Sequence, residues 1–175
     1  MCIRDRANIT CLTTSTQVNI VSYNGNKYVF NNGTSYNSNE KFGLYATTYT
    51  FTNVPSGHPI AILNNGNANI SYTGDASKKL SKTVTGTTND GTYDFYYGDV
   101  TVTVTGDFGN VSVYCYYHGY MGGENLLTYS VGCQNPGGSL GTVSYLDVVT
   151  GETTTFQYIK KLSLIHIWRC RRQAV

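Results

Sequence analysis

Three residues whose side chains bind soft metals follow one another at intervals of three in the second half of the chain. They are Cys115, His118 and Met121, in the stretch V-S-V-Y-C-Y-Y-H-G-Y-M-G-G that spans 111–123. A thiolate, an imidazole and a thioether form a ligand set that suits copper far better than magnesium or calcium, and a methionine ligand disfavours zinc. The spacing therefore predicts a soft-metal site in this stretch.

A trigonal copper site needs a second imidazole, and His58 is the candidate for it. His58 lies in V-P-S-G-H-P-I-A-I-L, where a turn-rich segment leads into the apolar run Ile60 to Leu63. Outside the two ends of the chain, the sequence has two histidines, His58 and His118, and one methionine, Met121. We therefore expect one copper ion as cofactor, with His58, Cys115, His118 and Met121 as its ligands.

The residues around Cys115 indicate how these side chains could converge. Apolar and polar residues alternate over 111–115, which is typical of a β-strand with one buried face, so Cys115 should point inward. Three glycines in the following loop allow the backbone to turn tightly: Gly119, Gly122 and Gly123. The strand and the loop should therefore bring the three side chains to one point.

With these residues the sequence resembles the cupredoxins, the family of type 1 blue copper proteins. The matching pattern is a histidine at the start of a strand and a later Cys-x2-His-x2-Met, with a short ligand loop like that of amicyanins. The stretches Y-T-F-T-N-V-P-S-G-H-P and Y-C-Y-Y-H-G-Y-M-G-G are also similar to uncharacterised cupredoxin-like proteins of marine microbial and viral metagenomes. The resemblance covers Gln17 to Ser130. It implies a Greek-key β-sandwich that carries out one-electron transfer and is not an enzyme.

The chain departs from the cupredoxin pattern at two places around the site. Cupredoxins usually have Asn after the first ligand histidine, and its backbone N–H bonds the cysteine sulfur; here that residue is Pro59, which has no N–H. We therefore expect the thiolate to be a stronger donor and the reduction potential to be lower than in a relative that keeps this bond. The proline often found between the cysteine and histidine ligands is also absent, and Tyr116 and Tyr117 stand there instead.

Both ends of the chain differ in composition from everything between them. Residues 1–6, M-C-I-R-D-R, and 162–175, L-S-L-I-H-I-W-R-C-R-R-Q-A-V, hold every arginine, the one tryptophan, Cys2 and Cys170. Both resemble translated sequencing-adapter read-through, and we interpret them as artefacts to be left out of fold reasoning. The alternative is that Ile165 to Arg172 is a real basic amphipathic tail that contacts nucleic acid or membrane.

Without its ends, the chain has the composition of an all-β domain. Residues 7–161 contain seven Lys, no Arg and nine Asp plus Glu, so their formal net charge is −2, whereas the whole chain has +2. This leaves no basic surface for nucleic acid. The body is rich in Gly, Thr, Ser, Asn and Tyr and has no long helical periodicity, which is typical of a β-sandwich or barrel. It also has no run of about 18 apolar residues that could span a membrane.

Three cysteines remain in the body, and their odd number is informative. If Cys115 is a metal ligand, Cys11 and Cys133 are free to pair, and such a disulfide would fit an oxidising, extracytoplasmic compartment: periplasmic, secreted or virion-associated. The alternative is that these two cysteines are unrelated reduced thiols.

The periodicity predicts a series of short strands. Gln17 to Tyr23 and Lys27 to Phe30 should form a hairpin around Asn24-Gly25-Asn26. Further expected strands are Thr47–Val54, Ile60–Leu63, weak ones near Ile70 and Val84, a three-strand meander of Tyr93–Tyr97, Val100–Thr105 and Val111–Tyr117, and Leu126–Tyr129. We expect residues 7–132 to form the sandwich. Residues 133–161 should form an extra hairpin, Thr142–Val148 with Thr153–Ile159, or the start of a truncated second domain.

Each site residue also has a simpler interpretation. Cys115 could be a small buried hydrophobe, His58 a turn residue and Met121 a gap-filler in the core. The combination, its order and its spacing favour the copper site, and Tyr116, Tyr117 and Tyr120 would then form the docking surface for a redox partner around His118. The alternative function is a structural or adhesive β-sandwich module of a secreted or virion-associated protein, with a vestigial or non-redox copper site.

Overall fold

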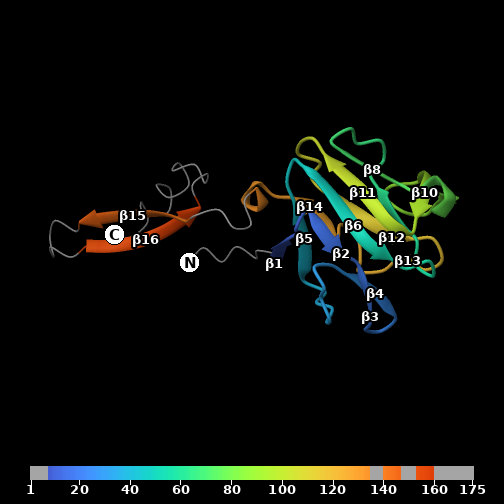
Figure 1. The fold of residues 1–175 in the computed structure, drawn as a ribbon, viewed down its shortest axis with the longest axis horizontal. Helices are drawn as coiled ribbons and strands as arrows, with labels where there is room; N and C mark the ends of the chain where they lie inside the picture. Colours follow the sequence, from blue (N-terminus) through green and yellow to red (C-terminus); the bar gives the residue numbers. More distant parts are fainter. Residues whose placement is uncertain (1–7, 135–139, 147–152, 160–175) are drawn as a thin grey trace. The chain divides into compact units, whose positions relative to one another are not determined.

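The structure is a computed structural model that describes residues 8–134, 140–146 and 153–159. The chain divides into two compact units, Met1–Gln134 and Asn135–Val175. The first unit is a β-sandwich, and the second contains a two-stranded hairpin (Figure 1). The predicted all-β sandwich with an additional hairpin is therefore confirmed. Among the described residues there is no helix long and apolar enough to cross a membrane.

The sandwich consists of two mixed sheets and a separate hairpin. The larger sheet has the order β1 (Asn8–Cys11), β5 (Glu40–Leu44), β14 (Leu127–Tyr129), β12 (Asn110–Cys115), β7 (Ile60–Leu63), β10 (Gly91–Tyr96) and β9 (Lys79–Val84), with β13 (Gly119–Tyr120) also paired to β12. The smaller sheet has the order β2 (Ser15–Gln17), β6 (Thr48–Val54), β11 (Gly98–Val104) and β8 (Ile70–Gly74). The separate hairpin consists of β3 (Asn19–Ser22) and β4 (Asn26–Val29).

Alternating side chains from both sheets form the core. In β11, Val100, Val102 and Val104 are buried, whereas the threonines between them are only partly covered. They belong to the same apolar cluster as Ile62 of β7 and Cys115 of β12, which come from the other sheet. This is the arrangement that alternating patterns produce when two sheets pack face to face.

The predicted three-strand meander is wrong. β10 and β12 both lie in the larger sheet, where each pairs with β7, but β11 between them in sequence lies in the smaller sheet and pairs with β6 and β8. Alternation shows that a strand has one buried face, but it is the same for a strand in either layer of a sandwich. The chain therefore crosses between the sheets at the two connections that separate these three strands.

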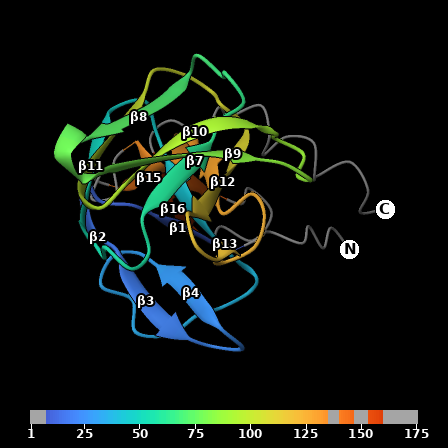
Figure 2. The same cartoon turned by 90° about the vertical axis from the view of Figure 1, so that its right-hand side faces the viewer.

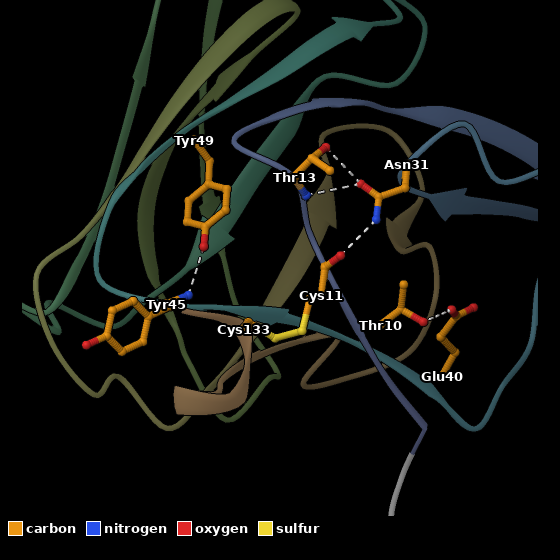
Figure 3. The surroundings of a disulfide bond; sticks show 8 residues. All are labelled: Thr10, Cys11, Thr13, Asn31, Glu40, Tyr45, Tyr49 and Cys133. Atoms are coloured by element: carbon orange, nitrogen blue, oxygen red, sulfur yellow. Dashed lines mark hydrogen bonds between the residues drawn. A yellow bond between two sulfur atoms is a disulfide. The ribbon is translucent and has the colours of Figure 1, made fainter. Parts of the chain in front are cut away.

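Strands β1, β2 and β5 were not expected from the sequence, and a disulfide lies beside two of them. Cys11, the last residue of β1, is bonded to Cys133 and faces Gly43 of β5 (Figure 3). A Cβ atom at Gly43 would lie 2.6 Å from the Cys133 sulfur and 2.7 Å from Ile9 Cγ2, so the close packing here needs glycine. Of the two options for these cysteines, the structure contains the disulfide.

Polar side chains reinforce the same region. The Asn31 amide nitrogen donates to the Cys11 carbonyl at 3.0 Å, and the Thr10 hydroxyl donates to the Glu40 carboxylate at 2.6 Å (Figure 3). These bonds join the first strand of the chain to residues 20 and 30 positions away, so they help to close the sandwich.

The second unit contains the predicted hairpin with a shifted first strand. β15 spans Leu140–Leu146 and pairs antiparallel with β16, Thr153–Ile159. The first strand begins two residues before the predicted Thr142, and residues 147–152 lie outside the described residues. The segments interpreted as artefacts, 1–6 and 162–175, also lie outside them.

Candidate metal centre

His58 lies in the connection between the two sheets. Strand β6 of the smaller sheet ends at Val54, and β7 of the larger sheet begins at Ile60. The connection is a turn in which the His58 N–H donates to the Pro55 carbonyl at 2.9 Å. All four residues of β7 are fully buried, so the strand fixes the end of the turn firmly in the core. The His58 side chain is half-buried.

Strand pairing brings Cys115 beside this turn. Cys115 is the last residue of β12 and lies opposite Ile60 in the antiparallel pair of β12 and β7. The Tyr116 N–H continues the contact by donating to the Pro59 carbonyl at 3.0 Å. Cys115 is completely buried and is the free cysteine of the described residues. The prediction that it points inward is confirmed.

The turn after Cys115 returns His118 to the same place. Cys115 pairs with Gly119 and Tyr114 with Tyr120, so β12 and β13 form a tight hairpin that has His118 in its turn. Gly119 has a φ of +74°, in the left-handed region that favours glycine, which agrees with its expected role. His118 is exposed, so one side of the cluster reaches solvent.

The three side chains present their donor atoms to one another. Cys115 Sγ lies 3.5 Å from His118 Nδ1 and 3.8 Å from His58 Nδ1. The ligand atoms of all three residues lie within 4.8 Å of one another, and the two imidazole rings are 4.7 Å apart at their centroids. Metal–nitrogen bonds of about 2.0 Å and metal–sulfur bonds of about 2.3 Å at trigonal to tetrahedral angles would separate a nitrogen from a sulfur by about 3.5–3.7 Å. The spacing therefore fits a single metal ion.

Met121 lies three residues after His118 and is buried like Cys115. It is 1% exposed and belongs to the same core cluster as Cys115. Its main-chain carbonyl accepts a hydrogen bond from the Tyr28 N–H at 2.8 Å. The structure thus brings His58, Cys115 and His118 together and buries Met121 in the adjoining core.

Electrostatics favour the form of His58 that binds metals. Burial lowers the pKa of His58, and the neighbouring His118 lowers it further. A neutral imidazole is the form that donates an electron pair to a metal, so these effects act in the direction that a metal site requires.

Two residues that sequence reasoning missed contact His58 from the β3–β4 hairpin. The Tyr28 hydroxyl donates to the His58 carbonyl at 2.9 Å, and the Asn26 amide lies 3.4 Å from His58 Nε2. Both precede His58 by 30 or more residues. They belong to no motif with the ligands, so no spacing rule could have found them.

Tyrosines flank the exposed histidine unevenly. Tyr117 is 58% exposed, and its ring centroid lies 6.3 Å from that of His118. Tyr116 and Tyr120 are half-buried, and Tyr120 packs edge-on against Tyr114. Of the three expected tyrosines, Tyr117 therefore offers most of the accessible surface beside His118.

A separate polar cleft of about 410 Å³ contains none of the predicted ligands. Its lining includes Tyr72, Asp90 and Asp94. Asp94 accepts hydrogen bonds from Lys79 and Ser81, and Asp90 accepts from Thr87, so both carboxylates already have partners in the surrounding strands and loops. These bonds lower the pKa of each carboxyl group. Among the described residues, the His58, Cys115 and His118 cluster is therefore the candidate functional site.

Comparisons with protein-family models, with curated proteins and with solved structures find no match to this chain. The class of protein is therefore defined by its own fold and site: an all-β sandwich with a His-Cys-His cluster that could hold a metal ion.

Proposed function

We propose that this chain is a mononuclear copper protein of the cupredoxin class and carries out one-electron transfer. The observation that supports this most strongly is the convergence of one buried cysteine and two histidines, whose ligand atoms lie within 4.8 Å of one another. Thiolate and imidazole donors suit zinc as well as copper, and the thioether of Met121 as a further donor would favour copper. An enzyme would need an open position for substrate at the metal, and four protein ligands would leave none. We infer an electron carrier and not an enzyme.

The residues of the chain would have distinct parts in such a site. The Cys115 thiolate and the imidazoles of His58 and His118 would hold the ion, and the Met121 thioether would be a further, weaker donor. Copper would supply one-electron chemistry by alternating between Cu(I) and Cu(II). Because Cys115 ends a paired strand and is completely buried, the sandwich would exclude water from the sulfur and keep its position fixed in both oxidation states.

A redox partner would dock where the cluster reaches solvent. His118 is exposed, and Tyr117 offers a large apolar surface with a polar tip beside it. We infer that the partner covers His118 and the adjoining surface of Tyr116, Tyr117 and Tyr120. The Cys11–Cys133 disulfide supports an extracytoplasmic location, since disulfides persist mainly in oxidising compartments.

Voltammetry of the copper-loaded protein tests this proposal. We expect one reversible wave that corresponds to one electron per chain, and unchanged circular dichroism between the oxidised and the ascorbate-reduced protein. The Cys115→Ser variant should give no such wave. Bound copper that cannot be cycled reversibly would contradict electron transfer and favour a structural or adhesive module with a non-redox site.

A further inference from the structure

The β3–β4 hairpin contacts both segments that carry the candidate ligands. It forms a two-stranded sheet of its own beside the sandwich, with Ile20 opposite Tyr28 (Figure 2). It nevertheless bonds to the turn that contains His58 and to the segment that contains Met121. Those two segments are more than 60 residues apart in sequence, so the hairpin joins parts of the site that the chain itself does not connect closely.

Tyr28 makes this connection with its main chain and with its side chain. Its main-chain N–H donates to the Met121 carbonyl at 2.8 Å, and its hydroxyl donates to the His58 carbonyl at 2.9 Å. The Pro59 carbonyl lies farther from the hydroxyl, at 3.5 Å, so the single hydroxyl proton belongs mainly to His58. Tyr28 is fully buried, and a bond made in such surroundings is costly to lose because its acceptor is left without a partner.

The pKa of Tyr28 agrees with this environment. Burial raises it far above its ordinary value, and the nearby Cys115 raises it further.

Asn26 acts on the ring of the same histidine. His58 Nδ1 faces the Cys115 sulfur, and Nε2 lies 3.4 Å from the amide nitrogen, Nδ2, of Asn26. If Nδ1 is to donate its electron pair to a metal, Nε2 must carry the proton. The Asn26 amide must then be flipped, so that its oxygen instead of its nitrogen faces that N–H. With its amide in that orientation, Asn26 would select the tautomer that the metal requires.

A second tyrosine reinforces the loop beyond Met121. The Tyr36 hydroxyl donates to the Gly122 carbonyl at 3.2 Å, and Lys27 of β4 lies over the Tyr36 ring. The carbonyl groups of two successive loop residues, Met121 and Gly122, are thus held by the hairpin and by the segment that follows it.

We propose that Tyr28 and Asn26 are positioning residues that hold His58 and the Met121 segment in the metal-binding arrangement before any metal enters. This inference rests on the proposed metal site. Neither residue contacts the metal: Tyr28 fixes the backbone on both sides of the site, and Asn26 fixes the tautomer and orientation of the His58 ring. Metal then binds to a site that needs little rearrangement, which increases its affinity.

The test compares two tyrosine-to-phenylalanine variants of the full chain. Tyr28→Phe removes the hydroxyl at the site. Tyr93→Phe is the matched control, since Tyr93 is also buried and its hydroxyl also donates to a backbone carbonyl, that of Asn89, at 2.9 Å. We measure the melting temperature, the Cu(II) affinity in competition with a chelator, and the imidazole nitrogen signals of the metal-free protein by NMR.

We expect both variants to melt at somewhat lower temperatures, but only Tyr28→Phe to weaken Cu(II) binding, by about 10- to 100-fold. It should also shift the His58 imidazole signals in the metal-free protein, and Tyr93→Phe should not. Asn26→Ala should weaken binding and increase the fraction of His58 with the proton on Nδ1. Asn26→Asp should restore binding, because a carboxylate can only accept from the Nε2–H.

The inference is overturned if Tyr28→Phe loses stability like the control but retains Cu(II) affinity within two-fold and leaves the His58 signals unchanged. If Tyr28→Phe does not fold, the two Asn26 variants provide the test. In that case the inference is overturned if Asn26→Ala binds Cu(II) with the same affinity as the wild type. If the wild type binds no copper, the proposed function fails. In that case the His58 signals of the metal-free variants still decide whether the hairpin positions this residue.

Discussion

Cys115 determines which chemistry the cluster can perform. It is buried at the end of a paired strand, and the other two cysteines that the structure describes, Cys11 and Cys133, are joined in a disulfide. The sequence predicted its inward orientation from alternation, and it predicted the approach of His118 from the three-residue spacing and the glycines. The expectation that His58 lies near Cys115 rested on residue type and on family resemblance. This proximity depends on the pairing of Ile60 with Cys115, which no local pattern reveals.

Met121→Leu tests whether Met121 contributes to the proposed metal site. Leucine has nearly the same volume, so the change should lower the free energy of unfolding of the metal-free protein by less than about 1.5 kcal/mol. The copper-loaded variant should remain coloured, with a higher reduction potential, because loss of a thioether donor destabilises the more highly charged Cu(II) state. Visible absorption and voltammetry measure the two effects. An unchanged potential would show that Met121 is a core residue without a bond to the metal.

The other residues of the site could not be predicted, for a physical reason. Ligands at i, i+3 and i+6 are recognisable because one turn must bring them together. Tyr28 and Asn26 act from a hairpin whose position depends on tertiary packing, and tyrosine and asparagine are common throughout this chain. Pattern reasoning has no means of separating these two from the rest.

At the scale of the elements, β5 shows why some strands escaped prediction. Its sequence, E-K-F-G-L, ends in three consecutive buried residues, and the fourth of its five residues is a glycine, so it lacks the alternation of a half-buried strand. It lies between β1 and β14 and pairs parallel with both, and the disulfide covers its glycine. Burial on both faces of β5 thus removed the alternation that predicts a strand. Ser112 of β12 shows the same effect, since it is buried where alternation predicted a solvent-facing residue.

Gly43→Ala tests the close packing at this strand. The added methyl group would lie 2.6 Å from the Cys133 sulfur, so the disulfide or the backbone must move. We expect the free energy of unfolding to fall by about 1–3 kcal/mol. Gly57→Ala is the matched control, since a Cβ there meets no atom within 4 Å, and it should change stability by no more than about 1 kcal/mol in either direction. Chemical denaturation measures both, and equal effects would show that Gly43 is not packed as described.

For the whole molecule, composition was sufficient to predict an all-β fold, but the connections between strands were not predictable. A Thr- and Tyr-rich, low-charge chain with short alternating segments favours a sandwich. Which strands pair depends on contacts between distant residues, and the meander expected from adjacent strands was replaced by crossings between the sheets. In the first unit, a disulfide joins Cys11 to Cys133, which is 122 positions later in the sequence.

Replacement of both Cys11 and Cys133 by alanine tests the contribution of this disulfide to stability. A crosslink that closes a loop of this length restricts the unfolded chain strongly, so its loss should lower the free energy of unfolding by about 2–5 kcal/mol. Denaturant unfolding measures this change. Cu(II) binding at a temperature where the variant is folded should be unaffected, since Cys115 remains. A variant as stable as the wild type would contradict the structural role of the bond.

Titration of the reduced, folded protein with Cu(II), followed by visible absorption, tests the central claim most directly. We expect an intense charge-transfer band from thiolate to metal that grows linearly and stops at one equivalent of copper per chain, and no such band in Cys115→Ser. Uptake of copper without this band, or equal absorption from Cys115→Ser, would contradict a copper site formed by His58, Cys115 and His118.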